Sequence, residues 1–159
     1  MSAWQHVAIV LCALSTSACY PIFHDVQDTP IVSGIVTMHG KPVADAMVQL
    51  YYNDPVLSDT NRVLAGKADA SGRFTIGPIK DFKYFGGLVG YAGTDWRLEF
   101  VVGGTHYQGW QNRSLGFPSA MIDVSCELDD PIKSGTLGLR STGEGFCRIV
   151  SERRNDAEN

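Results

Sequence analysis

Histidine, serine and acidic side chains are the residues of this sequence that could carry out catalysis or bind a metal ion. The histidines stand far apart, at positions 6, 24, 39 and 106, and no H-E-x-x-H, H-x-x-E or G-x-S-x-G motif is present. A serine triad would need His39 or His106, but no serine stands in a recognisable nucleophile turn. His24, Asp25 and Asp28 fall in a segment without the surrounding groups that support metal ligands. The sequence therefore predicts a non-enzymatic protein with no metal and no cofactor.

Aromatic side chains gather between Tyr84 and Trp110, next to the glycine-rich stretch at 86–93. The glycine spacing matches neither G-x-G-x-x-G nor a Walker A loop, so we expect an inter-strand loop rather than a phosphate site. Tyr107 and Trp110 are an odd number of positions apart, so one strand cannot place both on the same face unless a bulge intervenes. We therefore take Tyr91, Tyr107 and Trp110 as candidate binding-surface residues. The alternative is that they pack in the core or at its rim.

Cysteine supplies a second kind of chemistry near the N-terminus. The apolar run Val7–Leu14 is too short to span a bilayer but has the length of the central region of an export signal. Small residues follow, and then Cys19, whose thiol can form a thioether with a lipid. This pattern resembles the lipobox of bacterial lipoproteins, which implies a signal peptide at 1–18 and lipidation at Cys19. It departs from that pattern at Thr16, where leucine is usual, and in the absence of lysine and arginine from residues 1–6. The alternative is an ordinary secretory signal.

Two further cysteines remain once residues 1–18 are removed and Cys19 carries lipid. Cys126 and Cys147 form an even pair, and export would place them in an oxidising compartment, where disulfides persist. A bond between them would close a loop of about 20 residues, worth on the order of 3 kcal/mol in the chain-entropy model. We expect this disulfide; the alternative is a pair of buried free thiols.

Composition and charge narrow the class of protein. Seventeen acidic against thirteen basic residues give a formal net charge of −4, the opposite of the basic surface that nucleic-acid-binding proteins use. Charged residues make up only 19% of the chain, which contains 17 glycines and 7 prolines. Such a composition favours short strands joined by turns over long solvated helices. The length of 159 residues is that of one domain.

Alternation of apolar and polar residues predicts an all-β chain. The pattern is clearest at Ala46–Tyr52, Asp95–Val102 and Ala120–Leu128. Further strands are expected at Ile31–Met38, Arg62–Ala68, Arg73–Ile76, Thr105–Trp110 and Gly143–Val150. Polar loops are expected at 53–60 and 111–119, a solvated tether at 19–29 and a disordered tail at 151–159. The predicted fold is an antiparallel sandwich of seven to eight strands over residues 30–150.

Two motifs lie between Ile31 and Ile79. The first is Gly40-Lys41-Pro42-Val43-Ala44-Asp45-Ala46-Met47-Val48, and the second is Ala68-Asp69-Ala70-Ser71-Gly72-Arg73-Phe74-Thr75-Ile76. They resemble the G-K-P-V/L-x-G/D-A-x-V and T-D-x-x-G-R-F-x-F patterns of carboxypeptidase regulatory-like domains. The resemblance covers roughly a third of the chain and implies a transthyretin-like, or prealbumin-like, sandwich. Domains of this family accompany enzymes and transporters and are not themselves catalytic.

These observations predict a non-enzymatic lipoprotein of the bacterial cell envelope. Lipid on Cys19 would hold the sandwich at a membrane, where it presents loops to a protein or a glycan. Enteric lipoproteins that stay in the inner membrane have aspartate after the cysteine; Tyr20 there implies, by resemblance, the outer membrane, with the domain facing the periplasm. The alternatives are an accessory lipoprotein of a secretion machine, a periplasmic inhibitor or immunity protein, and an unlipidated periplasmic or secreted protein.

Overall fold

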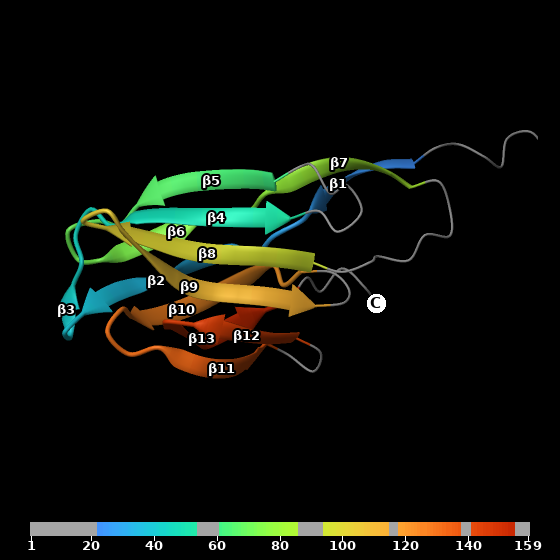
Figure 1. Ribbon diagram of the computed structural model, residues 1–159. Coiled ribbons are helices and arrows are strands. Elements are labelled where there is room, and N and C mark those ends of the chain that lie inside the picture. Colours follow the sequence, from blue (N-terminus) through green and yellow to red (C-terminus); the bar gives the residue numbers. More distant parts are fainter. Residues whose placement is uncertain (1–21, 54–60, 86–93, 115–117, 138–140, 155–159) are drawn as a thin grey trace, which may run out of the picture.

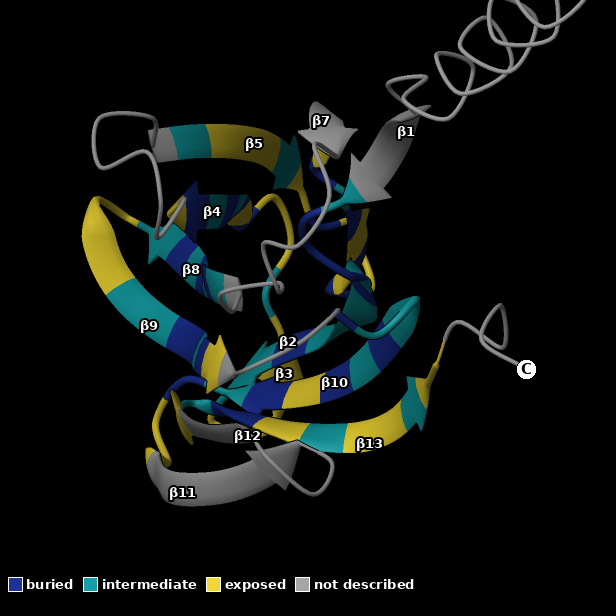
Figure 2. Ribbon diagram, turned by 90° about the vertical axis from the view of Figure 1, so that its right-hand side faces the viewer, coloured by how far each residue is buried: buried dark blue, intermediate teal, exposed yellow. Residues whose placement is uncertain are grey.

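The computed structural model describes residues 22–53, 61–85, 94–114, 118–137 and 141–154. Every regular element in these ranges is a β-strand, as the alternating sequence predicts. The strands form two large sheets and a two-stranded ribbon. The two sheets face each other and enclose the hydrophobic core, so the described chain is a β-sandwich (Figure 1, Figure 2).

The first sheet contains β4 (Met47–Asn53), β5 (Asn61–Lys67), β8 (Thr94–Val102), β9 (Thr105–Ser114), β11 (Ile132–Leu137) and β12 (Ser141–Gly145). Its strand order is β11-β12-β9-β8-β4-β5, and all neighbours are antiparallel. The predicted turn between β8 and β9 is Gly103-Gly104, where both residues have positive φ, 57° and 83°. Two such residues form the turn that suits the twist of a hairpin, and glycine adopts it at no steric cost.

The second sheet contains β2 (Ile31–Met38), β3 (Lys41–Pro42), β6 (Arg73–Ile76), β10 (Met121–Glu127) and β13 (Cys147–Arg153). β2 lies between β10 on one side and β3 and β6 on the other. β10 runs parallel to β2, so the prediction of a purely antiparallel sandwich is wrong at this pair. A parallel pair requires a long connection between its strands, and here four strands of the first sheet, β4, β5, β8 and β9, lie between them in the chain.

The core consists of the inward-facing side chains of both sheets. β4 buries every second residue from Val48 to Tyr52, and β10 does the same from Ile122 onward, as alternation predicts. Phe74 of β6 packs edge-on against Phe100 of β8, with ring centroids 5.3 Å apart. Burial of a large apolar side chain contributes about 1.5–3 kcal/mol, so this contact between the sheets stabilises the sandwich.

A β-bulge in β9 places Trp110 in the core. Leu98 of β8 lies opposite Trp110, and the register shifts at the next pair, so Gly109 is the extra residue. A methyl group on Gly109 would lie 2.5 Å from a ring carbon of Phe100, so the site has no room for a side chain. The bulge accounts for the odd spacing between Tyr107 and Trp110.

The chain crosses from the first sheet to the second between β12 and β13. Gly145, whose φ is 146°, passes so close to Gly109 that a Cβ would lie 2.2 Å from the Gly109 carbonyl oxygen. The next residue, Phe146, donates its N–H to the Gln108 carbonyl at 3.0 Å and accepts the Glu127 N–H at 3.1 Å. Phe146 therefore hydrogen-bonds to both sheets, and the last strand predicted from the sequence is divided into two.

Strands β1 (Ile22–Gln27) and β7 (Lys80–Phe85) form an antiparallel ribbon at one end of the sandwich (Figure 1). The tether predicted at 19–29 is therefore wrong over residues 22–29. Asp28 and Thr29 are completely buried, and both donate their backbone N–H to the Ile79 carbonyl oxygen. The Thr29 hydroxyl accepts the Ile79 N–H at 2.9 Å. Polar side chains fix the backbone here, which hydrophobic patterning does not reveal.

The remaining differences between the predicted and the observed strands also lie in polar segments. β9 continues to Ser114, and Asn112 is buried, where the sequence predicts a loop at 111–119. β11 had no alternation to predict it, and β13 continues through Arg153 into the predicted tail. The described residues thus form thirteen strands rather than seven to eight, because short polar strands carry a weak sequence signal. Residues 54–60 of the predicted loop and the glycine-rich segment 86–93 lie outside the described residues.

Candidate functional site

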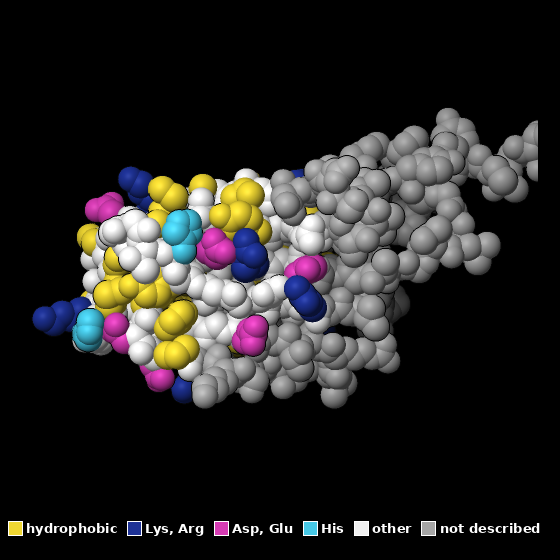
Figure 3. Space-filling model, in the orientation of Figure 1, with side chains coloured by type: hydrophobic (Ala, Val, Ile, Leu, Met, Phe, Trp, Pro, Cys, Tyr) yellow, Lys and Arg dark blue, Asp and Glu magenta, His cyan; other side chains and the backbone are white. Residues whose placement is uncertain are grey.

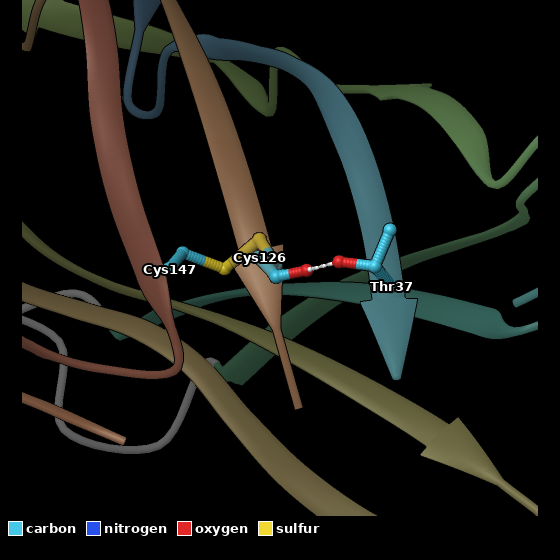
Figure 4. Close-up of a disulfide and its surroundings, with 3 residues drawn as sticks. All are labelled: Thr37, Cys126 and Cys147. Carbon is cyan, nitrogen blue, oxygen red and sulfur yellow. Dashed lines mark hydrogen bonds between the residues drawn. A yellow bond between two sulfur atoms is a disulfide. The ribbon is translucent and has the colours of Figure 1, made fainter. Parts of the chain in front are cut away.

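The cysteine pair predicted from the sequence forms a disulfide between β10 and β13. Cys126 and Cys147 lie directly opposite each other in the antiparallel register, with Cα atoms 4.0 Å apart. Both are completely buried, and the Thr37 hydroxyl donates a 2.9 Å hydrogen bond to the Cys126 carbonyl oxygen (Figure 4). The prediction of this bond is confirmed. It fastens the crossing between the sheets to a central strand and has a structural role, since buried cysteines are not reactive sites.

Trp110, predicted as a candidate binding-surface residue, does not lie at the surface. Its side chain is 1% exposed, because the bulge at Gly109 turns it into the core. Tyr107 is half-buried and packs edge-on against Phe146, with ring centroids 5.7 Å apart. Tyr91 lies outside the described residues, as does the predicted lipidation site, Cys19. Of the two described candidates, Tyr107 is the one that keeps part of its ring at the surface.

Two histidine side chains are described, and each has a different acidic partner. His39 lies in the β2–β3 turn, with Nδ1 3.3 Å from Oδ2 of Asp129, and His106 lies on β9, with Nδ1 3.8 Å from Oε2 of Glu99. The described residues contain no group of three or more His, Cys, Asp or Glu side chains that could hold a metal ion. A membrane-spanning helix is also missing from this described part of the chain.

A polar cluster occupies the outer face of the six-stranded sheet, formed by Tyr51 of β4, Arg97 and Glu99 of β8, and His106 of β9. We call these four residues the outer-face cluster. Arg97 lies opposite Tyr51 in the register, and its Nε is 2.7 Å from Oε1 of Glu99. Figure 3 shows acidic and basic side chains next to one another across this face. Arg97 and His106 are largely at the surface, and partly exposed ion pairs of this kind contribute little to stability, so the cluster chiefly defines the chemistry of the surface.

Tyr51 is held as a neutral hydrogen-bond donor within this cluster. Its hydroxyl donates to Oε1 of Gln49 at 3.0 Å, and the Arg97 guanidinium lies over its ring, 4.7 Å from the centroid. Burial, followed by the negative charge of Glu99, raises the pKa of Tyr51. A tyrosine with a raised pKa is a poor nucleophile at neutral pH, and Arg97 covers one face of its ring. The cluster can therefore recognise charged groups, but its tyrosine is not set up for catalysis.

A second polar cluster lies on the outer face of the other sheet. Ser33 of β2 and Ser151 of β13 donate their hydroxyl protons to the two carboxylate oxygens of Asp123 in β10, the bond from Ser151 being 2.5 Å long. These hydrogen bonds, the one from Ser151 first, hold the pKa of Asp123 below its usual range. No imidazole is among the described contacts of these serines, and an activated serine needs such a base. The cluster joins three strands rather than forming a nucleophile.

The exposed apolar side chains point to a different surface. The large ones among the described residues are Met47, Val63, Leu64 and Val150. Three of the four lie on β4 and β5, at one edge of the six-stranded sheet. β5 pairs with β4 and with no other described strand, so among the described residues its outer side is open to a further strand (Figure 1). We call residues 61–67 the β5 edge.

Comparison with known proteins adds no family to these observations. No protein-family model matches the chain, and no curated protein or solved structure is significantly similar to it. The resemblance of residues 31–79 to carboxypeptidase regulatory-like domains therefore stays a prediction.

Sequence reasoning placed three of the four members of the outer-face cluster, Tyr51, Arg97 and Glu99, but not His106, and it missed the contacts among them. Alternation predicts that Tyr51 points outward from one strand and that Arg97 and Glu99 point outward from another. The contacts form because β4 and β8 are neighbours in one register, which depends on the order of strands in the whole sheet. The β5 edge was missed for the same reason, although a strand was predicted at Arg62–Ala68.

Proposed function

We propose that this chain is a non-enzymatic lipoprotein of the bacterial cell envelope, in which a transthyretin-like sandwich anchored through Cys19 binds a partner protein. The observation that carries the proposal is the buried disulfide between Cys126 and Cys147. Such bonds persist in oxidising compartments and are rare in the cytosol. The disulfide thus supports the export signal expected at residues 1–18, a separate part of the sequence.

The contacts of the second motif support the family resemblance. Asp69 accepts the backbone N–H groups of Ser71 and Arg73 at 2.8 and 2.9 Å, and the Ser71 hydroxyl at 2.7 Å. The hydroxyl bond, followed by the Arg73 N–H, holds the pKa of Asp69 below its usual range. Gly72, whose φ is 72°, completes the turn, and Phe74 enters the core directly after it. Aspartate, glycine and phenylalanine of the motif each have a structural task, as a shared fold requires.

The N-terminal strand supports close attachment to a membrane. β1 begins at Ile22, so two residues separate it from Cys19, and a link of that length can reach at most about 10 Å. The other end of β1 is fixed, because the Gln27 side-chain amide donates to the carbonyl oxygens of residues 119 and 120 at 3.2 and 3.1 Å. Lipid on Cys19 would therefore hold the ribbon end of the sandwich near the bilayer.

The described surface favours a protein over a glycan as the partner. A sugar ring binds well on an open aromatic face, but Trp110 is buried, Arg97 covers one face of the Tyr51 ring, and Tyr107 is half-buried against Phe146. Apolar side chains at a sheet edge are exposed instead, beside the partly exposed Arg97–Glu99 ion pair, and these suit a protein interface.

Intact-mass spectrometry of the protein isolated from membranes tests the proposal. We expect a chain that begins at Cys19, carries acyl groups, and gains the mass of two hydrogen atoms on reduction. Cys19→Ala should remove the acyl mass, whereas Cys12→Ala, which alters the other cysteine of the leader, should not. An uncleaved or unlipidated chain would contradict the anchor. Free thiols at Cys126 and Cys147, trapped by alkylation before reduction, would contradict export.

A further inference from the structure

We propose that the β5 edge is the docking site for an extended, acidic strand of the partner protein, which would join the six-stranded sheet as a further strand. This inference deepens the proposed function and rests on the sandwich acting as a binding domain. β5 is the last strand of its sheet among the described residues, and Figure 2 shows it at the margin of the sheet beside β4.

Half of the backbone hydrogen-bonding groups of β5 point away from β4. The Ala68 N–H donates to the Ala46 carbonyl at 2.9 Å, which identifies these two residues as a hydrogen-bonded pair. Hydrogen-bonded pairs alternate along antiparallel strands, and the β4–β5 register continues from there without a shift. The even-numbered residues of β5 therefore bond to β4. The N–H and C=O groups of Val63, Ala65 and Lys67 face the open side, where a further strand would meet them.

β5 also lacks several of the features that protect an edge strand. It contains no proline, its pairing with β4 has no bulge, and it is seven residues long. Val63 is 47% exposed and Leu64 is 39% exposed, on opposite sides of the strand. Leu50, opposite Leu64 on the same face, is completely buried, so coverage of the core stops one strand short of the edge. An added strand would cover apolar surface on both sides.

The charges of β5 favour an acidic strand over a second copy of this chain. Arg62 and Lys67 are its two charged residues, and both are basic. β5 strands of two copies paired edge to edge would contribute four basic side chains and no acidic one, and like charges across strands are unfavourable. Lysine on an edge strand opposes such self-pairing. Asp28 already lies 3.7 Å from Arg62, so exposed Lys67 is the cation that a carboxylate of the partner would meet.

Hydrogen–deuterium exchange of the protein as isolated, with the capped probe peptide Glu-Val-Thr-Val-Thr-Val-Glu, tests the proposal. Saturating peptide should slow exchange at the amides of Val63, Ala65 and Lys67 by about tenfold or more. The amides of residues 62, 64 and 66, already bonded to β4, should not change. The same peptide with lysine for both glutamates should bind about tenfold more weakly, because cross-strand charge pairs change sign.

Variants of Ala65 and Lys67 distinguish edge pairing from other modes of binding. Ala65→Pro removes an N–H that faces the open side and should abolish the protection, whereas Ala65→Thr keeps that N–H and should bind like the native protein. Lys67→Glu, on the surface, should weaken binding of the acidic peptide about tenfold and strengthen that of the lysine peptide.

Three results would overturn the proposal. They are unchanged exchange at Val63, Ala65 and Lys67 with millimolar peptide, equal affinity for both peptides, and a dimer in sedimentation whose β5 amides are protected without peptide. The last result would assign the edge to a second copy of this chain. None of these readouts depends on Cys19, so a failed test of the lipid anchor leaves the outcome of this one distinguishable.

Discussion

Loss of the Cys126–Cys147 disulfide should destabilise the domain by about 3 kcal/mol. The bonded residues are separated by 21 positions, and the chain-entropy model gives about 3 kcal/mol for a loop of that length. The loop contains β11, β12 and the crossing at Phe146, all of which gain freedom in the unfolded chain when the bond is cut. For a domain of this size the loss corresponds to about 10 °C in Tm, or to a fall of about 1–2 M in the urea midpoint.

Urea unfolding followed by tryptophan fluorescence measures this loss, because Trp96 and Trp110 are both buried in the core. The native protein with reductant is the matched control, since it keeps both sulfur atoms and their packing. The double variant C126A/C147A should unfold at a slightly lower midpoint than the reduced protein, because each missing sulfur leaves a small cavity. An unchanged midpoint after verified reduction would refute the argument that the bond acts by restricting the unfolded chain.

Three further substitutions test individual contacts. Gly109→Ala should lower the Tm through a loss of about 1–3 kcal/mol, because its methyl group would lie 2.5 Å from the Phe100 ring. Thr29→Val should cost about 1–3 kcal/mol and speed amide exchange in β1 and β7, because the Ile79 N–H loses its 2.9 Å acceptor. Asp123→Asn should cost about 1 kcal/mol at pH 7. The pKa of Asp123 is lower in the folded state than in the unfolded state. The stability difference between the native protein and the variant, measured from urea midpoints, should therefore be largest above the unfolded-state pKa near 4. It should disappear as the pH falls through the folded-state pKa.

Each substitution has a matched control in the chain. Gly66→Ala should be tolerated, because its methyl group would come no closer than 4.0 Å to another atom, and equal losses at Gly66 and Gly109 would argue against the bulge. Thr29→Ser keeps the hydroxyl and should restore the native rate of exchange. Ser151→Ala removes one of two donors to Asp123 and should show the same pH dependence with a smaller amplitude. An Asp123→Asn difference that persists at pH 3 would contradict the assigned role of the carboxylate.

The central strands could be predicted because their side chains alternate between core and solvent. β4 and β10 each have apolar residues at every second position, and the structure buries them. β1, β7 and β11 have no such pattern. β1 and β7 are far apart in the chain and are held by pairing with each other, whereas β11 is held by pairing with β12, the next strand. The contact between Thr29 and Ile79 joins residues 50 positions apart, and nothing in the local sequence of either residue indicates it.

The position of Trp110 could not be predicted from residue spacing along the strand alone. The odd spacing from Tyr107 leaves two arrangements, exposure of one ring or a bulge between them, and spacing alone does not choose. The choice follows from packing, because Gly109 has no Cβ and so permits the Phe100 ring and Cys147 sulfur to approach it. A glycine directly before a tryptophan within a strand was the available signal for the bulge.

The β5 edge shows that a break in alternation can itself be informative. Val63 and Leu64 are consecutive apolar residues in a strand with one face toward the core, so one of them must point to solvent. In a central strand, neighbours on both sides would cover much of that side chain; at an edge, one side stays open and both residues remain exposed. The sequence shows the break in alternation, and the order of strands shows that the break lies on an edge strand. A single exposed apolar residue needs no explanation, but Val63 and Leu64 lie together with exposed Met47 of β4 at an edge strand, and such a group is the place to look for a partner.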